Sequence, residues 1–430
     1  MLKAGFARLD ITPPLGTHLD GYFGIRLANG VLDPIELNAI ALNDGEKTVV
    51  MISADLLGID IADVKHIKKK IEERLGLSEE CVLLHAIHQH TTFWLDNQIR
   101  PNRLPAAYIE VLYTKFVDVA QLAIDDMEEA TLSSAEKETA ETIAFVRRYR
   151  LDDGRAVTNP RSDELPHIVS RLAEADNTVR LLRFKREGKK DIALVNFSTH
   201  PDVVSGFKVS ADWPGFTRRF VEADNSDVSC VFFTGAQGDS NHLDYIKGTK
   251  TGYEHSRHMG RVVADAVAAI WDKTTPRASD KLFAKISVIY NKSNTEGEEK
   301  YEEAKAFEKA RAEKTLNYAP TIEEMAYARR IIAIRESMTI YRPIPITVIG
   351  IGEVVIVGLA GEPFTEYGEA LREASNGKFA LTFCNTNGKQ GYLPSVEAYA
   401  QGGYEAKSSQ FTPELESQII GEAKKLIDMI

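Results

Sequence analysis

Several apolar runs of strand length, each followed by a polar or glycine-containing turn, constrain the fold of this chain more than any other feature. Continuous apolar runs are typical of strands that are buried on both faces, as in a sheet covered by helices. Residues 61–75 and 106–127, which separate the early strands, have the apolar spacing of helices. The sequence therefore predicts an α/β fold, with a mixed β-sheet core flanked by helices and ligands bound at the strand ends. The runs cover residues 48–53, 81–87, 192–197, 228–233 and 354–359.

The remaining segments suggest how the chain is organised. Residues 300–338 are charged and rich in alanine, which predicts a solvated helical hairpin. Residues 346–361 predict a β-hairpin that turns near Gly352 and Glu353. We find no internal repeat and no proline-rich linker. We therefore expect one catalytic domain over residues 1–430, with a helical excursion at 300–338 and a carboxy-terminal segment, 341–430, that completes the site.

Composition narrows the function classes. The chain has 430 residues and a formal net charge of −11. An acidic surface repels phosphate, which disfavours nucleic acid and anionic membranes as partners. No apolar stretch is long enough to predict a transmembrane segment, and the amino terminus shows no secretory signal. Three widely spaced cysteines predict free thiols. We expect a cytoplasmic protein that acts on a small molecule, unless a leader has been removed. The sequence leaves open whether the chain forms a homo-oligomer.

His88 and His90 follow the apolar run at 81–87. If the strand continues through them, both imidazoles leave the same face, because strand side chains alternate with period 2. Such a pair can bind a metal ion with one ring and handle a proton with the other. The alternative is a pair of hydrogen-bonded histidines in an ordinary loop.

Three other segments carry polar groups at strand ends. His200 precedes a proline, which fixes an extended turn and holds the ring at the strand mouth. Residues 234–242 combine two glycines with several polar side chains. Glu362 ends an apolar strand, where a buried carboxylate needs a cation. His200 could also be a structural turn histidine, and residues 234–242 could be a plain turn. The residue types allow a zinc site with two histidines, one carboxylate and room for water, but their spacing does not prove that they meet.

In their order along the chain, these blocks resemble the catalytic domain of the neutral/alkaline, non-lysosomal ceramidase family. The resemblance runs from Gly5 to about Ala406, and it is to a short, bacterial-type member without the carboxy-terminal immunoglobulin-like domain. It begins with Ala-Arg-Leu-Asp-Ile-Thr-Pro-Pro-Leu-Gly at 7–16, Gly-Tyr at 21–22, Asp-Pro at 33–34 and Ser-Ala-Asp-Leu-Leu-Gly at 53–58. The His-x-His, His-Pro, Gly-Asp, Gly-Glu and tyrosine-rich blocks follow in the family's order.

The resemblance implies zinc-dependent hydrolysis of an amide by metal-activated water. It places the zinc ligands at His88, His200, Glu362 and Tyr392. It makes His90 a catalytic histidine that does not bind the metal, and Tyr404 the second active-site tyrosine. Arg147 matches a substrate-contacting arginine, with Arg148 as the competing alignment, and Asp239 of the Gly-Asp block joins the catalytic set.

Departures from the family pattern concern the substrate. Thr91 follows the histidine pair where the family has serine, and Trp94 lies where the family tends to have glycines. In the Gly-Asp block, Asn241 aligns with the serine of the family, so we assign no serine nucleophile. Thr91, Trp94 and Asn241 become candidate substrate contacts. Without a secretion signal or the immunoglobulin-like domain, we expect a substrate that is more soluble than ceramide. An ester, lactone or polyol-type metabolite is the first alternative, and a non-catalytic binding protein on the same fold is the second.

Overall fold

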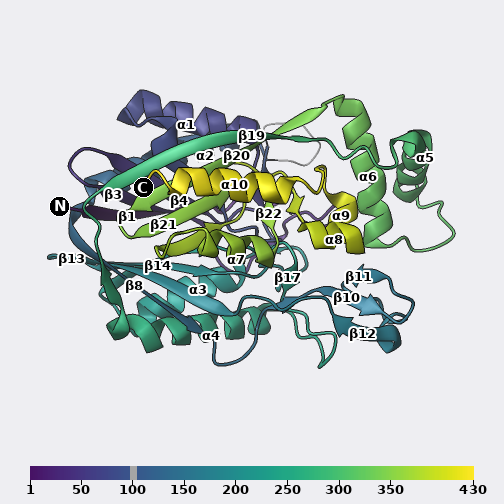
Figure 1. Cartoon of the computed structure of the whole chain (residues 1–430), viewed down its shortest axis with the longest axis horizontal. Coiled ribbons are helices and arrows are strands. Elements are labelled where there is room, and N and C mark those ends of the chain that lie inside the picture. Colours follow the sequence, from purple (N-terminus) through teal and green to yellow (C-terminus); the bar gives the residue numbers. More distant parts are fainter. Residues whose placement is uncertain (97–103) are drawn as a thin grey trace.

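Two stacked β-sheets form the core of the computed structural model, which describes residues 1–96 and 104–430 (Figure 1). The small sheet has the strand order β19 (Leu282–Lys292), β20 (Tyr341–Ile351), β21 (Val354–Leu359), β23 (Phe379–Phe383). The large sheet has the order β16 (Val228–Thr234), β14 (Asp191–Phe197), β13 (Thr178–Arg186), β8 (Glu128–Glu138), β1 (Lys3–Asp10), β3 (Glu36–Asn43), β4 (Thr48–Ala54), β6 (Val82–Ala86), and β18 (Thr275–Arg277) pairs with β8.

Helices cover the outer faces of both sheets, which confirms the predicted mixed α/β core. The outer face of the large sheet packs against α1 (Ile61–Leu75), α2 (Ala106–Asp125), α3 (Asp212–Asp224) and α4 (Tyr253–Ile270). The small sheet packs against α7 (Thr365–Glu373) and α10 (Leu415–Ile427). The core therefore contains two sheets, whereas the apolar runs predicted one mixed sheet.

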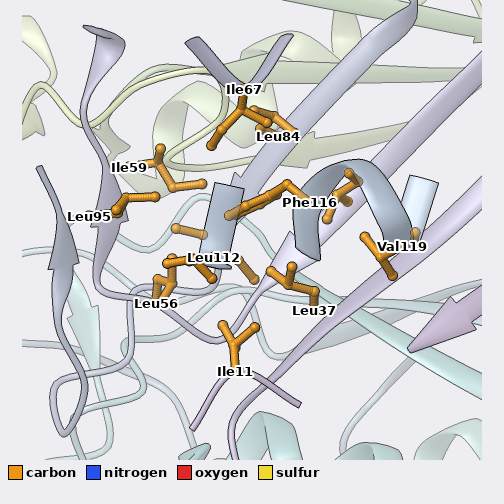
Figure 2. Packing of buried hydrophobic residues seen from close by; sticks show 14 of the residues in the cluster. Ile11, Leu37, Leu56, Ile59, Ile67, Leu84, Leu95, Leu112, Phe116 and Val119 are labelled. Atoms are coloured by element: carbon orange, nitrogen blue, oxygen red, sulfur yellow. The ribbon is translucent and has the colours of Figure 1, made fainter. Parts of the chain in front are cut away.

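Burial on both faces explains the continuous apolar runs. In β4, Val50 and Ile52 belong to the core beneath α1 and α2, whereas Met51 packs into the core between the two sheets. Between the sheets, the rings of Phe233 and Phe383 stack with their centroids 4.3 Å apart. Figure 2 shows the outer core, where Leu112, Phe116 and Val119 of α2 meet side chains from several strands and loops.

Three pairs of parallel strands bring distant loops together. β4 pairs with β6, β14 with β16, and β21 with β23, all in parallel. The loops that leave the carboxyl ends of β6, β14, β16 and β21 carry His88, His200, Asp239 and Glu362, respectively. The predicted position of the site at strand ends follows from this topology.

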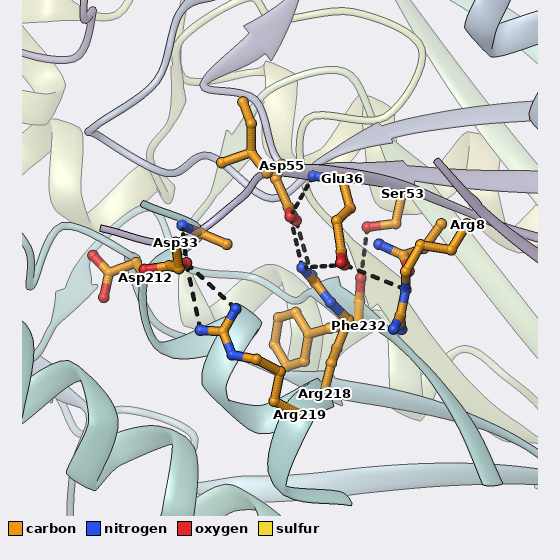
Figure 3. Close-up of polar contacts among 12 residues, drawn as sticks. Arg8, Asp33, Glu36, Ser53, Asp55, Asp212, Arg218, Arg219 and Phe232 are labelled. Carbon is orange, nitrogen blue, oxygen red and sulfur yellow. Dashed lines mark hydrogen bonds and ion pairs between the residues drawn. The ribbon is translucent and has the colours of Figure 1, made fainter. Parts of the chain in front are cut away.

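A buried ion network supports one of these loops (Figure 3). Arg218 of α3 donates to both carboxylate oxygens of Asp55, at 2.8 and 2.6 Å, and its side chain is 1% exposed. It also contacts Glu36, which forms an ion pair with Arg8 of β1. Asp55 follows β4 directly, so the network fixes the residues that lead into Leu56 and Leu57.

A helical hairpin extends from the sheets beside a small three-stranded sheet. α5 (Tyr301–Ala312) and α6 (Ile322–Ser337) form this hairpin at the right of Figure 1, which confirms the predicted helical excursion. A capping box between Thr321 and Glu324 begins α6. The neighbouring sheet consists of β10 (Arg148–Leu151), β11 (Ala156–Thr158) and β12 (Ile168–Arg171). Within the described residues, no helix combines the length and apolar character needed to cross a membrane.

The structure also contains short two-stranded ladders and short helices. The ladders are β2 (Gly30–Val31) with β15 (Lys208–Val209), β5 (Gly58–Ile59) with β7 (Trp94–Leu95), β9 (Phe145–Val146) with β17 (Ser240–Asn241) and β22 (Glu362–Pro363) with β24 (Tyr392–Leu393). The helices are α8 (Val396–Gln401) and α9 (Tyr404–Ser408). The three cysteines are free, as predicted.

Candidate metal centre

His88 lies in a strained turn and not in a strand. β6 ends at Ala86, and the φ angle of His88 is 70°, in the left-handed region that side chains rarely adopt. Such a conformation costs about 1–2 kcal/mol and tends to occur at functional sites. The prediction that His88 and His90 share a face because a strand continues through them is therefore wrong. The two rings nevertheless lie close together, with centroids 5.0 Å apart.

Backbone carbonyls fix the protonation of two histidines. Nδ1 of His88 lies 2.8 Å from the carbonyl oxygen of Leu57. Nδ1 of His200 lies 2.9 Å from the carbonyl oxygens of both Gln237 and Ser240. Because a carbonyl oxygen only accepts hydrogen bonds, each Nδ1 carries a proton, and the tautomer that these contacts favour presents a lone pair on Nε2.

Both of these lone pairs face a single carboxylate oxygen. Oε2 of Glu362 lies 3.1 Å from Nε2 of His88 and 3.3 Å from Nε2 of His200, and all three side chains are buried. Three electron-rich atoms in contact repel each other unless a proton or a cation lies between them. A proton on His200 is disfavoured, because burial and then the charge of Arg147 lower the pKa of this histidine.

The spacing of these atoms fits a metal ion. Ligands that bind zinc tetrahedrally at about 2.0–2.2 Å lie roughly 3.3–3.6 Å from one another. The two observed separations from Oε2 of Glu362, 3.1 and 3.3 Å, come close to that spacing. The donor set, two imidazoles and a carboxylate, is also one that zinc accepts.

Strand pairing places Tyr392 beside Glu362. The two residues are direct partners in the parallel ladder of β22 and β24. The Tyr392 hydroxyl accepts a hydrogen bond of 2.9 Å from Nη2 of Arg147. Arg147 is itself held by Glu405, at 2.9 Å from Nε, and by the carbonyl oxygen of Gly238. Arg147 therefore orients the phenol, whereas Arg148 points to Gln401 and Gly402 at the end of α8.

The ring of His90 lies beside those of His88 and His200, with centroids 5.0 and 5.8 Å away. Both of its ring nitrogens are buried without a hydrogen-bond partner among the described residues. Burial, and then His88, lower its pKa well below the usual value, so the ring is neutral at pH 7. Tyr22 packs against the ring, with centroids 5.2 Å apart. A Cβ atom on Gly21, whose φ is 99°, would lie 2.7 Å from Nδ1 of His90, so this position needs glycine.

The geometry allows a second ligand set. His88, His90 and His200 each offer a ring nitrogen within 4.8 Å of the other two. A metal ion can therefore be held either by these three imidazoles or by His88, His200 and Glu362, whose Nε2 and Oε2 atoms are 3.1 and 3.3 Å apart. Tyr392 as a further ligand stays a prediction.

Tyr404 lies beside Tyr392. Its ring lies 5.4 Å from that of Tyr392, and burial raises its pKa to about 12, so the phenol keeps its proton at pH 7. It begins α9 after Gly403 and lines a cleft of about 1040 Å³ that reaches the helical hairpin.

The other predicted residues lie around this cluster, and their contacts are structural. Oδ1 of Asp239 accepts two hydrogen bonds of 2.9 Å from Thr365 at the start of α7. The Asn241 side chain donates to Asn159. Thr91 bonds to Gln89, and the ring of Trp94 packs under the ammonium of Lys389. Their predicted roles in catalysis or substrate binding stay predictions.

Sequence reasoning missed the residue that anchors Arg147. Glu405 is fully buried and accepts hydrogen bonds from Arg147, at 2.9 Å, and from Thr158, at 2.7 Å. Its position directly after Tyr404 was visible in the sequence, but nothing marked it as buried.

Comparisons with known proteins identify the fold. No family model matches the sequence, and no curated protein does. The structure is similar to that of neutral ceramidase from Pseudomonas aeruginosa, with a TM-score of 0.72 at 15% identity over 99% of this chain and 74% of that one. It is also similar to a structure described as ceramidase complexed with C2, with a TM-score of 0.71 at 14% identity and the same coverage. The chain therefore has the ceramidase fold that its sequence led us to expect.

Proposed function

We propose that this protein, which has the fold of neutral ceramidase, is a zinc-dependent hydrolase that cleaves an amide bond in a substrate more soluble than ceramide. One observation carries the proposal. Two imidazoles with fixed Nδ1 protons direct their Nε2 lone pairs at the same buried carboxylate oxygen, an arrangement that a divalent cation stabilises.

The residues around this cluster suit the hydrolysis of a carbonyl compound. A bound zinc ion supplies a water of pKa about 7 and polarises the carbonyl group. Beside the cluster, His90 offers a neutral ring whose nitrogens are free among the described residues to accept or return a proton. Tyr404 keeps its proton and can donate a hydrogen bond to the oxyanion that develops on the substrate. Arg147 acts through Tyr392, whose hydroxyl it orients.

The first experiment measures bound metal. The purified protein is expected to contain about one equivalent of zinc by elemental analysis, and His88→Ala and His200→Ala are expected to lose both zinc and hydrolytic activity. His167→Ala, a change in an exposed histidine, serves as the control and should keep both. Retention of zinc and activity in the His88 and His200 variants would overturn the proposal.

His90 distinguishes the two ligand sets. If Glu362 and Tyr392 complete the site, His90→Ala should retain zinc and lose activity by about a hundredfold or more. If His90 is the third ligand, this variant should lose zinc as well, and Glu362→Gln should retain it.

A substrate screen tests the bond that is cleaved. Amides, esters and lactones of short acids are offered together with long-chain ceramide. We expect turnover of the short amides. Turnover of esters or lactones alone would retain the metal site but overturn the amide assignment, and exclusive turnover of long-chain ceramide would overturn the soluble substrate.

A further inference from the structure

One arginine binds the backbone of three loops next to His90. Nη2 of Arg26 donates to the carbonyl oxygens of both Asp20 and His90, at 2.6 Å each, and Nη1 donates to the carbonyl oxygen of Gly206 at 3.1 Å. These oxygens belong to the loop before β2, the loop after β6 and the loop before β15. Because the donor is charged, its hydrogen bonds are stronger than those between neutral groups. Arg26 therefore connects three segments that are distant in the sequence.

The same guanidinium group packs on Tyr22. Cζ of Arg26 lies 4.2 Å from the centroid of the Tyr22 ring, a distance at which a cation is attracted to an aromatic ring. The Tyr22 ring in turn packs edge to face with the ring of His90, with centroids 5.2 Å apart. Arg26 is thus linked to His90 in two ways, through the backbone carbonyl of the histidine and through Tyr22.

His90 depends on these contacts because its own ring is not anchored. Among the described residues, neither of its ring nitrogens has a hydrogen-bond partner, whereas Nδ1 of His88 and Nδ1 of His200 are bound to backbone carbonyls. The backbone N–H of His90 donates to the carbonyl oxygen of Pro201 at 3.2 Å, and its carbonyl oxygen accepts from Arg26. The direction of the ring is therefore set by these two backbone bonds and by the packing around it.

We propose that Arg26 is a positioning residue that fixes His90 beside the metal centre. The proposal rests on the proposed hydrolase function, in which His90 accepts or returns a proton, and it names the group that holds this histidine in place. All of the hydrogen bonds that Arg26 donates among the described residues go to backbone carbonyl oxygens, so it acts through His90 and not on the substrate. A displacement of a catalytic group by about 1 Å can lower the rate by about a hundredfold.

The test replaces Arg26 and measures turnover, zinc and backbone exchange in the whole protein. In Arg26→Ala, kcat for a short amide should fall by about tenfold to a hundredfold, while KM and the zinc content stay unchanged. Deuterium exchange of the backbone amides at 88–92 should become faster, because the loop loses its anchor. Arg26→Lys keeps the charge but not the fork of donors, so its kcat should lie between the two. Millimolar guanidinium should restore part of the turnover of Arg26→Ala by filling the vacated space.

Arg183→Ala provides the matched control. The Arg183 guanidinium also packs on an aromatic ring, 4.3 Å from the centroid of Trp271, and donates to the carbonyl oxygen of Trp271 at 3.1 Å. It pairs with Ala193 near the start of β14, whereas His200 follows the end of that strand. This variant should be less stable than the unaltered protein but keep its kcat, and guanidinium should not change its turnover.

Three results would overturn the role of Arg26. Unchanged kcat and unchanged exchange at 88–92 in Arg26→Ala would show that it does not hold His90. A higher KM at unchanged kcat would make it a substrate contact, and loss of zinc would make it a support of the metal ligands. Failure of the hydrolase function itself would appear as absent turnover in the unaltered protein. Exchange at 88–92 would then still report whether Arg26 holds the His90 segment.

Discussion

Replacing Arg218 by methionine should destabilise the protein far more than the same change at Arg219. The two arginines are neighbours on α3, and each binds a carboxylate. The Arg218 side chain is 1% exposed and makes two hydrogen bonds, of 2.8 and 2.6 Å, to Asp55, which is 0% exposed. The Arg219 side chain is 38% exposed, and its nearest contact to Asp33 is 3.4 Å. Figure 3 shows both arginines with their carboxylate partners. Burial is the main difference between the two pairs.

The expected costs follow from that difference. Removing one partner of a buried pair leaves an uncompensated charge and typically costs about 3–5 kcal/mol. Breaking an exposed pair costs about 0–1 kcal/mol. The free energy of unfolding should therefore fall by about 3 kcal/mol more in Arg218→Met than in Arg219→Met. Since Asp55 leads into Leu57, whose carbonyl binds His88, the first variant should also hold zinc less tightly.

Urea unfolding of both variants, monitored by circular dichroism, measures the difference. A double variant that adds Asp55→Asn to Arg218→Met should recover part of the lost stability, because it removes the unpaired charge. Equal losses in the Arg218 and Arg219 variants would refute the argument that burial decides the cost. So would a double variant that is less stable than Arg218→Met.

Two further predictions concern pH and catalysis. Burial lowers the pKa of Lys68 to about 7, below that of the unfolded chain, so the unfolded state binds more protons and stability rises with pH between about 7 and 10. Lys68→Met should therefore raise the free energy of unfolding at pH 6 by up to about 4 kcal/mol. In urea titrations this gain should shrink toward pH 10. A gain in stability that does not change with pH would contradict the prediction. Gly21→Ala should lower turnover and leave the zinc content unchanged, because the new Cβ displaces His90, and unaltered turnover would show that His90 does not depend on Gly21.

The strands and helices could be predicted from the sequence because burial on both faces leaves a local pattern. The helix at 61–75 agrees with the structure because its apolar residues recur with helical spacing, and the hairpin at 300–338 because its charged, alanine-rich sequence favours solvated helices. The stacking of two sheets left no such mark, since a strand covered by a sheet is as apolar as one covered by a helix.

The candidate site was predicted only in part. Local patterns suggested His88, His200 and Glu362, but the resemblance to a family was needed to add Tyr392. The turn at His88 was not predictable, because its left-handed conformation is stabilised by tertiary contacts to Leu56 and Leu57. The same limit explains why Glu405 was missed, since its burial depends on Arg147 from a distant strand end.

The most direct test of the account is a crystal structure with diffraction data collected on both sides of the zinc absorption edge. We expect an anomalous peak about 2.0–2.2 Å from Nε2 of His88, Nε2 of His200 and a carboxylate oxygen of Glu362. If the purified protein shows no metal there, and Glu362 instead forms direct hydrogen bonds with protonated rings, the central claim is contradicted.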